Sequence, residues 1–372
     1  MRILYTFRSL AVWGGIERVL VEKMNHFVTM YGDEVYMLTT DQGNHPIPYE
    51  LDPRIKVEDL GIDFYKQYRY KGLRRLWEDY KRTKLFENKF SRHISEKRPD
   101  MIVCTTTDPV YSIIRVKGVT PLVVEAHNIC SRALGEKGPH QRIAAWLLKM
   151  GLKKADFLVA LTEGDAVEWR NYHPHVTVIP NIVKLNREGL SSLENKRVIW
   201  VGRFDYQKRP MEIIRIWQQV YPHFIDWHLD IYGEGEQLQE METVVQSLDM
   251  NIHIHQPTKN IFIAYRDSSI LVSTSLFEPF GLVIPEAMSC GLPIVAYDCP
   301  YGPSMMISDG DNGFLVEDNN RQVFIDQLCL LMSDINLCQR MGKAASMSVR
   351  HFSNSNIMPI WRCLFLSLLS SK

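Results

Sequence analysis

The sequence lacks paired cysteines and any recognisable metal motif. Its seven cysteines are scattered over 372 residues and form no CxxC pair. Disulfide-stapled domains and structural zinc sites usually show such pairs, so we expect neither, and a reducing compartment is favoured. No group of His, Cys, Asp and Glu has a metal-ligand spacing either. We therefore expect a protein that requires no metal or other cofactor.

Long hydrophobic runs and net charge are also absent. No apolar run approaches the roughly 20 residues that span a bilayer, and the apolar stretch at the N-terminus is too short for a signal peptide. The chain has 43 Lys and Arg against 43 Asp and Glu, which gives no bulk attraction to nucleic acid. We expect a cytoplasmic protein without a nucleic acid partner.

Three common nucleotide-binding or catalytic signatures are missing as well. The chain contains no GxGxxG dinucleotide fingerprint, no Walker A loop and no GxSxG elbow, which argues against the enzyme classes built on them. What is present is an ordinary soluble composition, 45% apolar and 23% charged. The length favours two domains over one core.

Short apolar runs alternate with helical patterns throughout the chain, which predicts parallel sheets covered on both faces. The longest expected helix runs from about Gly72 to Lys97. In the first half the expected strands are Ile3–Phe7, Glu34–Thr40, Ile55–Gly61, Met101–Thr106, Leu122–His127, Phe157–Thr162 and Val176–Pro180. In the second half they are Arg197–Gly202, His228–Tyr232, Ile252–His255, Ile270–Thr274, Pro293–Tyr297 and Gly313–Val316.

The strand pattern restarts after a polar stretch, which divides the chain into domains. We expect two doubly wound, Rossmann-like α/β domains, residues 1–180 and 181–353, facing across a cleft. The C-terminal helix, within residues 354–372, is amphipathic and is expected to pack back on the first domain. Ligands of such sheets bind beyond the carboxyl ends of the strands, so a ligand is expected between the domains.

The most informative segment follows the expected strand Ile270–Thr274. It places Glu278 and Glu286 eight residues apart, with Gly281 between them. We expect a helix to begin at Gly281, whose free N–H groups and positive dipole end suit a phosphate. Two carboxylates around an anion site suit a nucleotide-sugar. Taken alone, a Glu near a helix N-terminus is common, and this spacing also arises by chance.

Two cations follow the first strand of the second half. Arg203 can bind a phosphate through two hydrogen bonds, and Lys208 adds a point charge, so together they could neutralise a diphosphate. Taken alone, such a pair is more often two solvated loop charges.

In the first half, two loops at strand ends are candidates. Gly14 and Gly15 precede an expected helix near Ile16 and would let backbone N–H groups approach an anion. A Gly-Gly turn is also common for structural reasons. His127 ends a strand, where it could contact a sugar hydroxyl or carry a proton; a capping or core histidine is the alternative.

The segment Tyr65–Arg98 is strongly basic, with twelve Lys or Arg against four Asp or Glu and interleaved aromatic residues. Such a segment can lie on an anionic membrane surface. A solvated helix face is the equal alternative. Nucleic acid is disfavoured because no known reader motif is present.

Taken together, these pieces resemble the large retaining glycosyltransferase family 4, which has the GT-B architecture. The second half carries the more specific signal. The run Asp298–Ser304 also resembles members that build bacterial surface polysaccharides or lipid-linked oligosaccharides. The matching segments are Gly14–Arg18, His127-Asn128, Ala160–Thr162, Pro180-Asn181, Gly202-Arg203 with Lys208, Tyr232–Gly235, Glu278–Gly281 with Glu286–Met288, Gly291–Pro293, and Asp309-Gly310 with Asn312–Val316.

The resemblance implies roles for these residues. Arg203 and Lys208 would grip the diphosphate, and Glu286 would bond the ribose. Glu278 and the backbone of Phe280, Gly281 and Leu282 would hold the donor sugar and phosphate. His127 would contact the sugar near the reacting centre, and Gly14 and Gly15 would close over the diphosphate.

The implied activity is a metal-independent, retaining transfer of a hexose-type sugar. The donor would be a nucleotide-sugar, with UDP the expected carrier, and the acceptor a hydroxyl of a glycan or lipid-linked molecule. Peripheral contact with the inner membrane face through Tyr65–Arg98 would bring the enzyme to such an acceptor. Alternatives on the same fold are a nucleotide-sugar epimerase, a phosphorylase, or a non-catalytic sugar-binding subunit.

Overall fold

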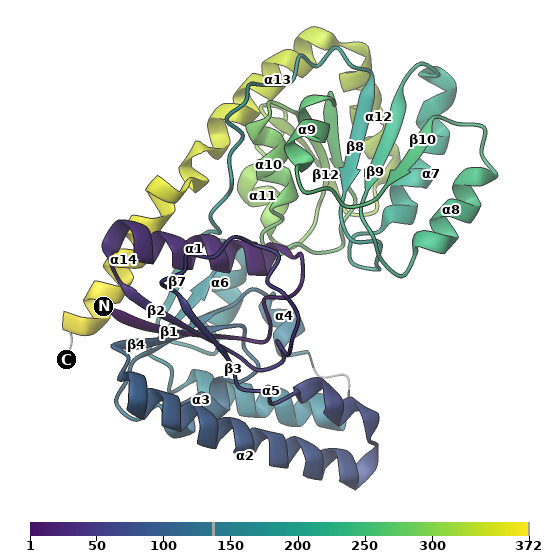
Figure 1. The fold of residues 1–372 in the computed structure, drawn as a ribbon. Helices are drawn as coiled ribbons and strands as arrows, with labels where there is room; N and C mark the ends of the chain where they lie inside the picture. The colour runs from purple at the N-terminus through teal and green to yellow at the C-terminus, as the bar shows by residue number, and fades with distance from the viewer. Residues whose placement is uncertain (136–137, 371–372) are drawn as a thin grey trace. The chain divides into compact units, whose positions relative to one another are not determined.

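The chain divides into two compact units in a computed structural model that describes residues 1–135 and 138–370. Unit 1 comprises Met1–Ile182 and Asn354–Lys372, and unit 2 comprises Val183–Ser353. Each unit is built on one parallel sheet flanked by helices (Figure 1). Among the described residues, no helix is both long and apolar enough to cross a membrane.

Unit 1 contains a seven-stranded parallel sheet in the order β3-β2-β1-β4-β5-β6-β7. The order reverses between β1 and β4, and such a switch point is where doubly wound sheets bind ligands. The central strands are buried throughout, as parallel sheets covered on both faces require. The strands are β1 Arg2–Phe7, β2 Glu34–Thr39, β3 Lys56–Asp59, β4 Met101–Thr105, β5 Leu122–Glu125, β6 Phe157–Ala160 and β7 Val176–Val178.

Alternation along the strands builds two hydrophobic cores, one on each face of this sheet. Ile3 and Tyr5 pack with α1 and α14, whereas Leu4 packs with α2, α3 and α5. Figure 1 shows the same two layers of helices. The helices of unit 1 are α1 Gly15–Tyr31, η1 Phe64–Arg69, α2 Gly72–Lys97, α3 Val110–Val116, α4 Cys130–Ala133, α5 Pro139–Leu152, α6 Glu163–Trp169 and α14 Asn354–Ser370.

The C-terminal helix α14 completes the first of these cores. Phe365 is fully buried and stacks on Phe27 of α1, with ring centroids 5.1 Å apart. Arg362 also donates to Asp33 across 2.6 Å. Burying a Phe side chain stabilises a fold by about 1.5–3 kcal/mol, so α14 is an integral part of unit 1 although 171 residues of unit 2, Val183–Ser353, separate it from the rest.

Unit 2 contains a six-stranded parallel sheet in the order β10-β9-β8-β11-β12-β13, again with a reversal, here between β8 and β11. The prediction of two doubly wound α/β domains is confirmed. The strands are β8 Arg197–Val201, β9 His228–Tyr232, β10 Ile252–His255, β11 Ile270–Ser273, β12 Ile294–Asp298 and β13 Gly313–Glu317. The helices are α7 Pro210–Val220, η2 Tyr221–His223, α8 Leu238–Gln246, α9 Ile261–Arg266, α10 Val283–Ser289, α11 Gly302–Met306, α12 Arg321–Ser333, α13 Ile335–Ser348 and η3 Val349–Phe352.

Candidate functional site

In unit 2, the two central strands β8 and β11 each end in a loop with a candidate residue. Lys208 follows β8, and Glu278 follows β11. The Lys208 ammonium contacts Glu278 Oε1, and the Ser275 hydroxyl donates to the same oxygen across 2.7 Å. The two charged side chains are 15% and 7% exposed. The fold therefore joins residues 70 positions apart into one ion pair at the switch point.

The loop between β8 and α7 is organised by Asp205. Its carboxylate accepts from the Lys208 backbone N–H across 3.0 Å and pairs with Arg203 Nε at 2.9 Å. Arg203 also donates to Gln207 across 3.0 Å, and its side chain stays 66% exposed. The two predicted cations thus differ: Lys208 is paired with Glu278, and Arg203 lies at the surface of the same loop. Sequence reasoning missed Asp205, whose signal was its place between the two cations.

Glycines of the neighbouring loop hold this one in position. A Cβ on Gly233 would lie 1.9 Å from the Gly202 carbonyl oxygen, and one on Gly235 would lie 2.5 Å from that of Phe204. The Phe204 N–H also donates to the Glu234 carbonyl across 2.8 Å. Only glycine permits this close backbone approach, so the Tyr232–Gly235 segment supports the Arg203–Lys208 loop.

The backbone around Glu278 is fixed by the loop after β12. Its N–H donates to the Pro300 carbonyl across 2.7 Å, and its carbonyl accepts from Tyr301 and Gly302, both across 2.8 Å. Gly302 fits because a Cβ there would lie 2.0 Å from the Phe280 carbonyl oxygen. Glu278 is therefore held by its backbone independently of its side-chain pair.

The prediction that a helix begins at Gly281 is wrong. Helix α10 begins at Val283, with Leu282 as its cap, because Gly281 has a φ of +83°, a left-handed conformation outside the helical region. Glu286 falls in the first turn and is 3% exposed. The Phe280 ring is buried against Phe352, with centroids 5.4 Å apart, so only its backbone is available to a ligand.

In unit 1, the Gly14-Gly15 pair lies at the start of α1. Gly14 caps the helix in an extended conformation, and its carbonyl accepts from the Tyr49 hydroxyl across 2.7 Å. Trp13 lies beside Tyr49 with ring centroids 5.5 Å apart and is about half exposed. The glycines therefore occupy a helix start as expected, next to an aromatic pair.

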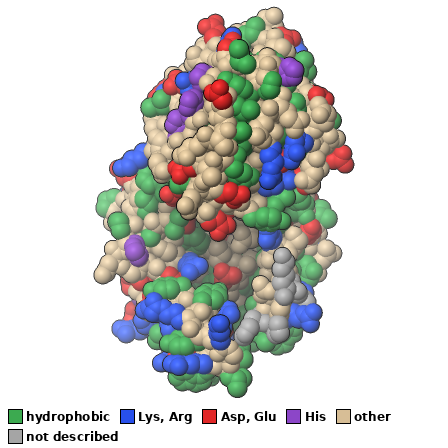
Figure 2. Space-filling view, turned by 90° about the vertical axis from the view of Figure 1, so that its right-hand side faces the viewer, with side chains coloured by type: hydrophobic (Ala, Val, Ile, Leu, Met, Phe, Trp, Pro, Cys, Tyr) green, Lys and Arg blue, Asp and Glu red, His purple; other side chains and the backbone are tan. Residues whose placement is uncertain are grey.

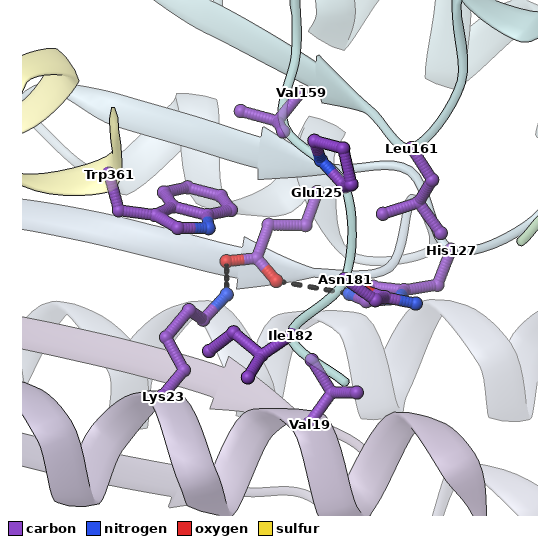
Figure 3. A pocket seen from close by; sticks show the side chains of 10 residues that line it. Val19, Lys23, Glu125, His127, Val159, Leu161, Asn181, Ile182 and Trp361 are labelled. Carbon is purple, nitrogen blue, oxygen red and sulfur yellow. Dashed lines mark hydrogen bonds and ion pairs between the residues drawn. The ribbon is translucent and has the colours of Figure 1, made fainter. Parts of the chain in front are cut away.

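His127 lies in a pocket of unit 1 that the sequence did not reveal (Figure 3). Its Nε2 is 3.1 Å from Glu125 Oε2, and the other Glu125 oxygen contacts the Lys23 ammonium from α1. The Lys23 and Glu125 side chains are each 2% exposed. The pocket is lined by Val19, Lys23, Glu125, His127, Val159, Leu161, Pro180, Asn181, Ile182 and Trp361.

The position of Glu125 follows from strand alternation. Residue Val123, two positions earlier, faces the core under α1 and α14, so Glu125 points to the same face. A Glu in an apolar run is a signal of a paired buried charge, but its partner Lys23 is 102 residues away. Burial raises the pKa of Glu125, but the Lys23 charge and the hydrogen bond with His127 outweigh it and hold that pKa below its ordinary value.

Comparisons with known proteins bear on both units. The model described as glycosyltransferase family 4 matches residues 13–187, and the model described as glycosyl transferases group 1 matches residues 183–347. An uncharacterized glycosyltransferase of Haemophilus influenzae is 29% identical over 219 residues, which are 57% of this chain and 62% of that relative. The match therefore spans less than two thirds of that relative's length.

Two further similarities extend over nearly the whole chain. A Campylobacter jejuni α-1,4-N-acetyl-D-galactosaminyltransferase, named for a diNAcBac-PP-undecaprenol glycan, is 22% identical over 356 residues, 94% of each chain. The crystal structure of Anabaena HepE in complex with UDP superposes with a TM-score of 0.75 at 18% identity, covering 100% of both chains. This structural likeness shows that the fold has the GT-B architecture.

Proposed function

Since the chain belongs to glycosyltransferase family 4, as a family 4 model over residues 13–187 and a glycosyl transferases group 1 model over residues 183–347 indicate, we propose that it transfers a sugar from a nucleotide-sugar donor to a hydroxyl group of a glycan or lipid-linked acceptor. The proposed setting is bacterial surface glycan synthesis, which the undecaprenol-linked substrate in the Campylobacter relative's name supports. The donor is proposed to be UDP-linked and hexose-type, because crystal structures of the similar HepE hold UDP, in one case together with glucose.

The Lys208–Glu278 pair is the observation that carries this proposal. It lies where the strand order of unit 2 reverses, at the edge where such sheets bind nucleotides. A lysine can donate to a diphosphate, and a carboxylate can accept from sugar hydroxyls. The pair thus presents complementary groups for the two halves of a nucleotide-sugar. In the absence of ligand each group neutralises the other, which keeps a partly buried site stable.

The proposed mechanism is electrostatic. As the bond from the sugar to the diphosphate breaks, negative charge develops on the leaving group, and Lys208 and Arg203 stabilise it. Arg203 can turn from Asp205 toward a phosphate because its side chain is 66% exposed. We propose retention of configuration and no required metal. Unchanged activity after exhaustive chelation is the expected result, and loss that Mg²⁺ or Mn²⁺ restores would contradict this part.

The experiment is a thermal-shift panel of UDP-, GDP- and ADP-sugars on the wild-type chain and on Lys208→Met. A bound donor raises the apparent melting temperature, and we expect the UDP-sugars to do so in the wild type and not in the variant. Lys196→Met is the matched control, because Lys196 forms an exposed ion pair with Asp226 in the same unit. An equal shift in all three proteins would overturn the assignment of Lys208.

Product analysis separates the proposal from its alternatives. A transferase forms a new glycan only when the acceptor is present. An epimerase converts the donor without acceptor, a phosphorylase consumes inorganic phosphate, and a non-catalytic subunit binds the donor without turnover. Acceptor-dependent release of nucleoside diphosphate is the result we expect.

A second proposal concerns the basic surface of η1 and α2. Leu73 is 84% exposed, Tyr68 65% and Trp77 59%, although such side chains are usually buried. Arg75 lies over the Tyr68 ring at 4.9 Å from its centroid, and Lys81 over Trp77 at 5.3 Å. Figure 2 shows hydrophobic and basic side chains interleaved at the lower end, where Figure 1 labels α2. We propose that this surface contacts anionic lipid, since cations and aromatic rings together suit that interface.

A further inference from the structure

Three charged or titratable side chains in unit 1 contact one another in series, and the last of them is His127. Lys23 comes from α1, and Glu125 and His127 come from β5 and the residues after it. The Lys23 ammonium contacts Glu125 Oε1, and Glu125 Oε2 lies 3.1 Å from His127 Nε2 (Figure 3). Trp361 of α14 covers the ammonium, which lies 4.1 Å from its ring centroid.

This arrangement determines which nitrogen of His127 carries the proton. An ionised carboxylate only accepts hydrogen bonds, so the nitrogen that faces Glu125 must be the protonated one. The neighbouring Lys23 keeps the carboxylate ionised, because a protonated Glu125 would leave a buried ammonium without a counter-charge. In a neutral imidazole with a protonated Nε2, Nδ1 is an acceptor.

His127 Nδ1 is the last polar atom in this series of side-chain contacts. It is buried and has no hydrogen-bond partner among the described residues. Buried polar atoms of native proteins are nearly always satisfied by protein, water or ligand. A hydroxyl group that donates to Nδ1 would complete the hydrogen bonding of the ring.

We propose that Lys23 and Glu125 are positioning residues, which fix His127 with Nε2 protonated and Nδ1 ready to accept a hydrogen bond from a hydroxyl of the transferred sugar. The sugar as ligand rests on the proposed function, whereas the orientation of the ring does not. Trp361 has a supporting part, because it shields the ammonium from water and ties the positioning pair to the C-terminal helix.

A purely structural ion pair is the competing explanation, so the test needs a measurement that such a pair would not alter. The double variant Lys23→Met with Glu125→Gln removes both charges together and leaves no buried ion unpaired, which favours folding. Arg362→Met is the matched control, because it removes the partly buried pair with Asp33 in the same unit. Circular dichroism and thermal melting establish that both variants fold.

The first readout is the tautomer of His127 from its ¹⁵N chemical shifts, measured on the full chain without ligand. We expect a protonated Nε2 in the wild type and in Arg362→Met, and a mixture of tautomers in the double variant. A protonated Nδ1 in the wild type, or an unchanged tautomer in the double variant, would overturn the proposal.

The second readout is steady-state transfer. Outer partners that orient metal-ligating histidines are typically worth about 10–100-fold; by analogy we expect kcat to fall by about that factor in the double variant and less than twofold in Arg362→Met. The KM for the donor should change little, since the proposed function assigns the contacts with the diphosphate and the ribose to unit 2. An unchanged kcat would overturn the positioning role. An inactive wild type that still shows the Nε2 tautomer would count against the proposed function and support the positioning pair.

Discussion

Each of the two units buries a Lys–Glu pair near the carboxyl edge of its sheet, but the two pairs differ in their access to solvent. The Lys23–Glu125 side chains are 2% exposed each, and the Lys208–Glu278 side chains are 15% and 7% exposed. We call Lys23–Glu125 the sealed pair; it has a third partner, His127, and an aromatic cover, Trp361. We call Lys208–Glu278 the open pair; it has a hydroxyl partner, Ser275.

This difference separates two uses of the same chemistry. A charge that a ligand must reach has to remain partly hydrated, so that its neighbours can exchange one partner for another. A charge that only orients another group can be sealed, and sealing strengthens its interactions because the local dielectric is low. We therefore assign the open pair to ligand binding and the sealed pair to positioning.

The largest expected effect is on stability, and it comes from breaking the sealed pair on one side. Lys23→Met alone leaves a buried carboxylate without a counter-charge, which typically costs about 3–5 kcal/mol. The double variant Lys23→Met with Glu125→Gln should recover most of this loss. Urea unfolding of both proteins measures it. If the single and double variants unfold at the same urea concentration, the two side chains do not act as a pair.

The next effect is on activity, and it comes from the open pair. Lys208→Ala removes a donor to the developing charge of the leaving group, and loss of one such donor typically costs about 10²–10³-fold in kcat. Glu286→Ala should abolish transfer, through loss of the contact with the ribose that we propose for this residue. Both variants should fold, as circular dichroism can show. Full transfer activity in both would refute the assigned site.

The sequence was sufficient for the sheets and insufficient for the sealed pair. Strands such as Met101–Thr105 are apolar runs bounded by turns, and helix α2 spans Gly72–Lys97 as expected. Both could be predicted because the pattern of apolar residues within a short segment indicates its secondary structure. The start of α10 was predicted two residues early, since Gly281 reads equally well as a helix start or as a left-handed turn. Lys23 gave no signal, because its partner is far away in the sequence and only the fold brings them together.

Unit 1 also carries cations on its surface, which contrast with the buried Lys23. Arg74 and Arg75 lie over the Tyr70 and Tyr68 rings on the η1–α2 surface, where each charge should contribute about 1 kcal/mol to binding of anionic lipid. In the double variant Arg74→Glu with Arg75→Glu, less protein should co-sediment with vesicles that contain phosphatidylglycerol. Added salt should also reduce co-sedimentation of the wild type. The control is Lys196→Glu, which reverses the charge of an exposed lysine in unit 2 and should leave the binding of vesicles unchanged. Binding that ignores both lipid charge and salt would remove the membrane proposal.

The smallest expected effect is a difference in acid stability. The pKa of Glu125 in the folded protein lies below its ordinary value of 4.5, because the opposing effect of burial is outweighed by Lys23 and His127. A carboxyl group with a lowered pKa contributes stability that is fully present above the unfolded value and is lost as the pH falls through the folded one. The contribution of Glu125 should therefore be fully present at pH 7 and be lost as the pH falls below 4.5 and through the lowered pKa of the folded state.

The double variant Lys23→Met with Glu125→Gln isolates this contribution, because all other carboxyl groups titrate alike in both proteins. The free energy of unfolding, measured by urea between pH 7 and pH 3.5, should fall further in the wild type than in the double variant. If the two curves run parallel, Glu125 gains nothing from its charge in the folded state. The sealed pair would then give the charge of Glu125 no net stabilisation, and its difference from Lys208–Glu278 would have to be explained by packing alone.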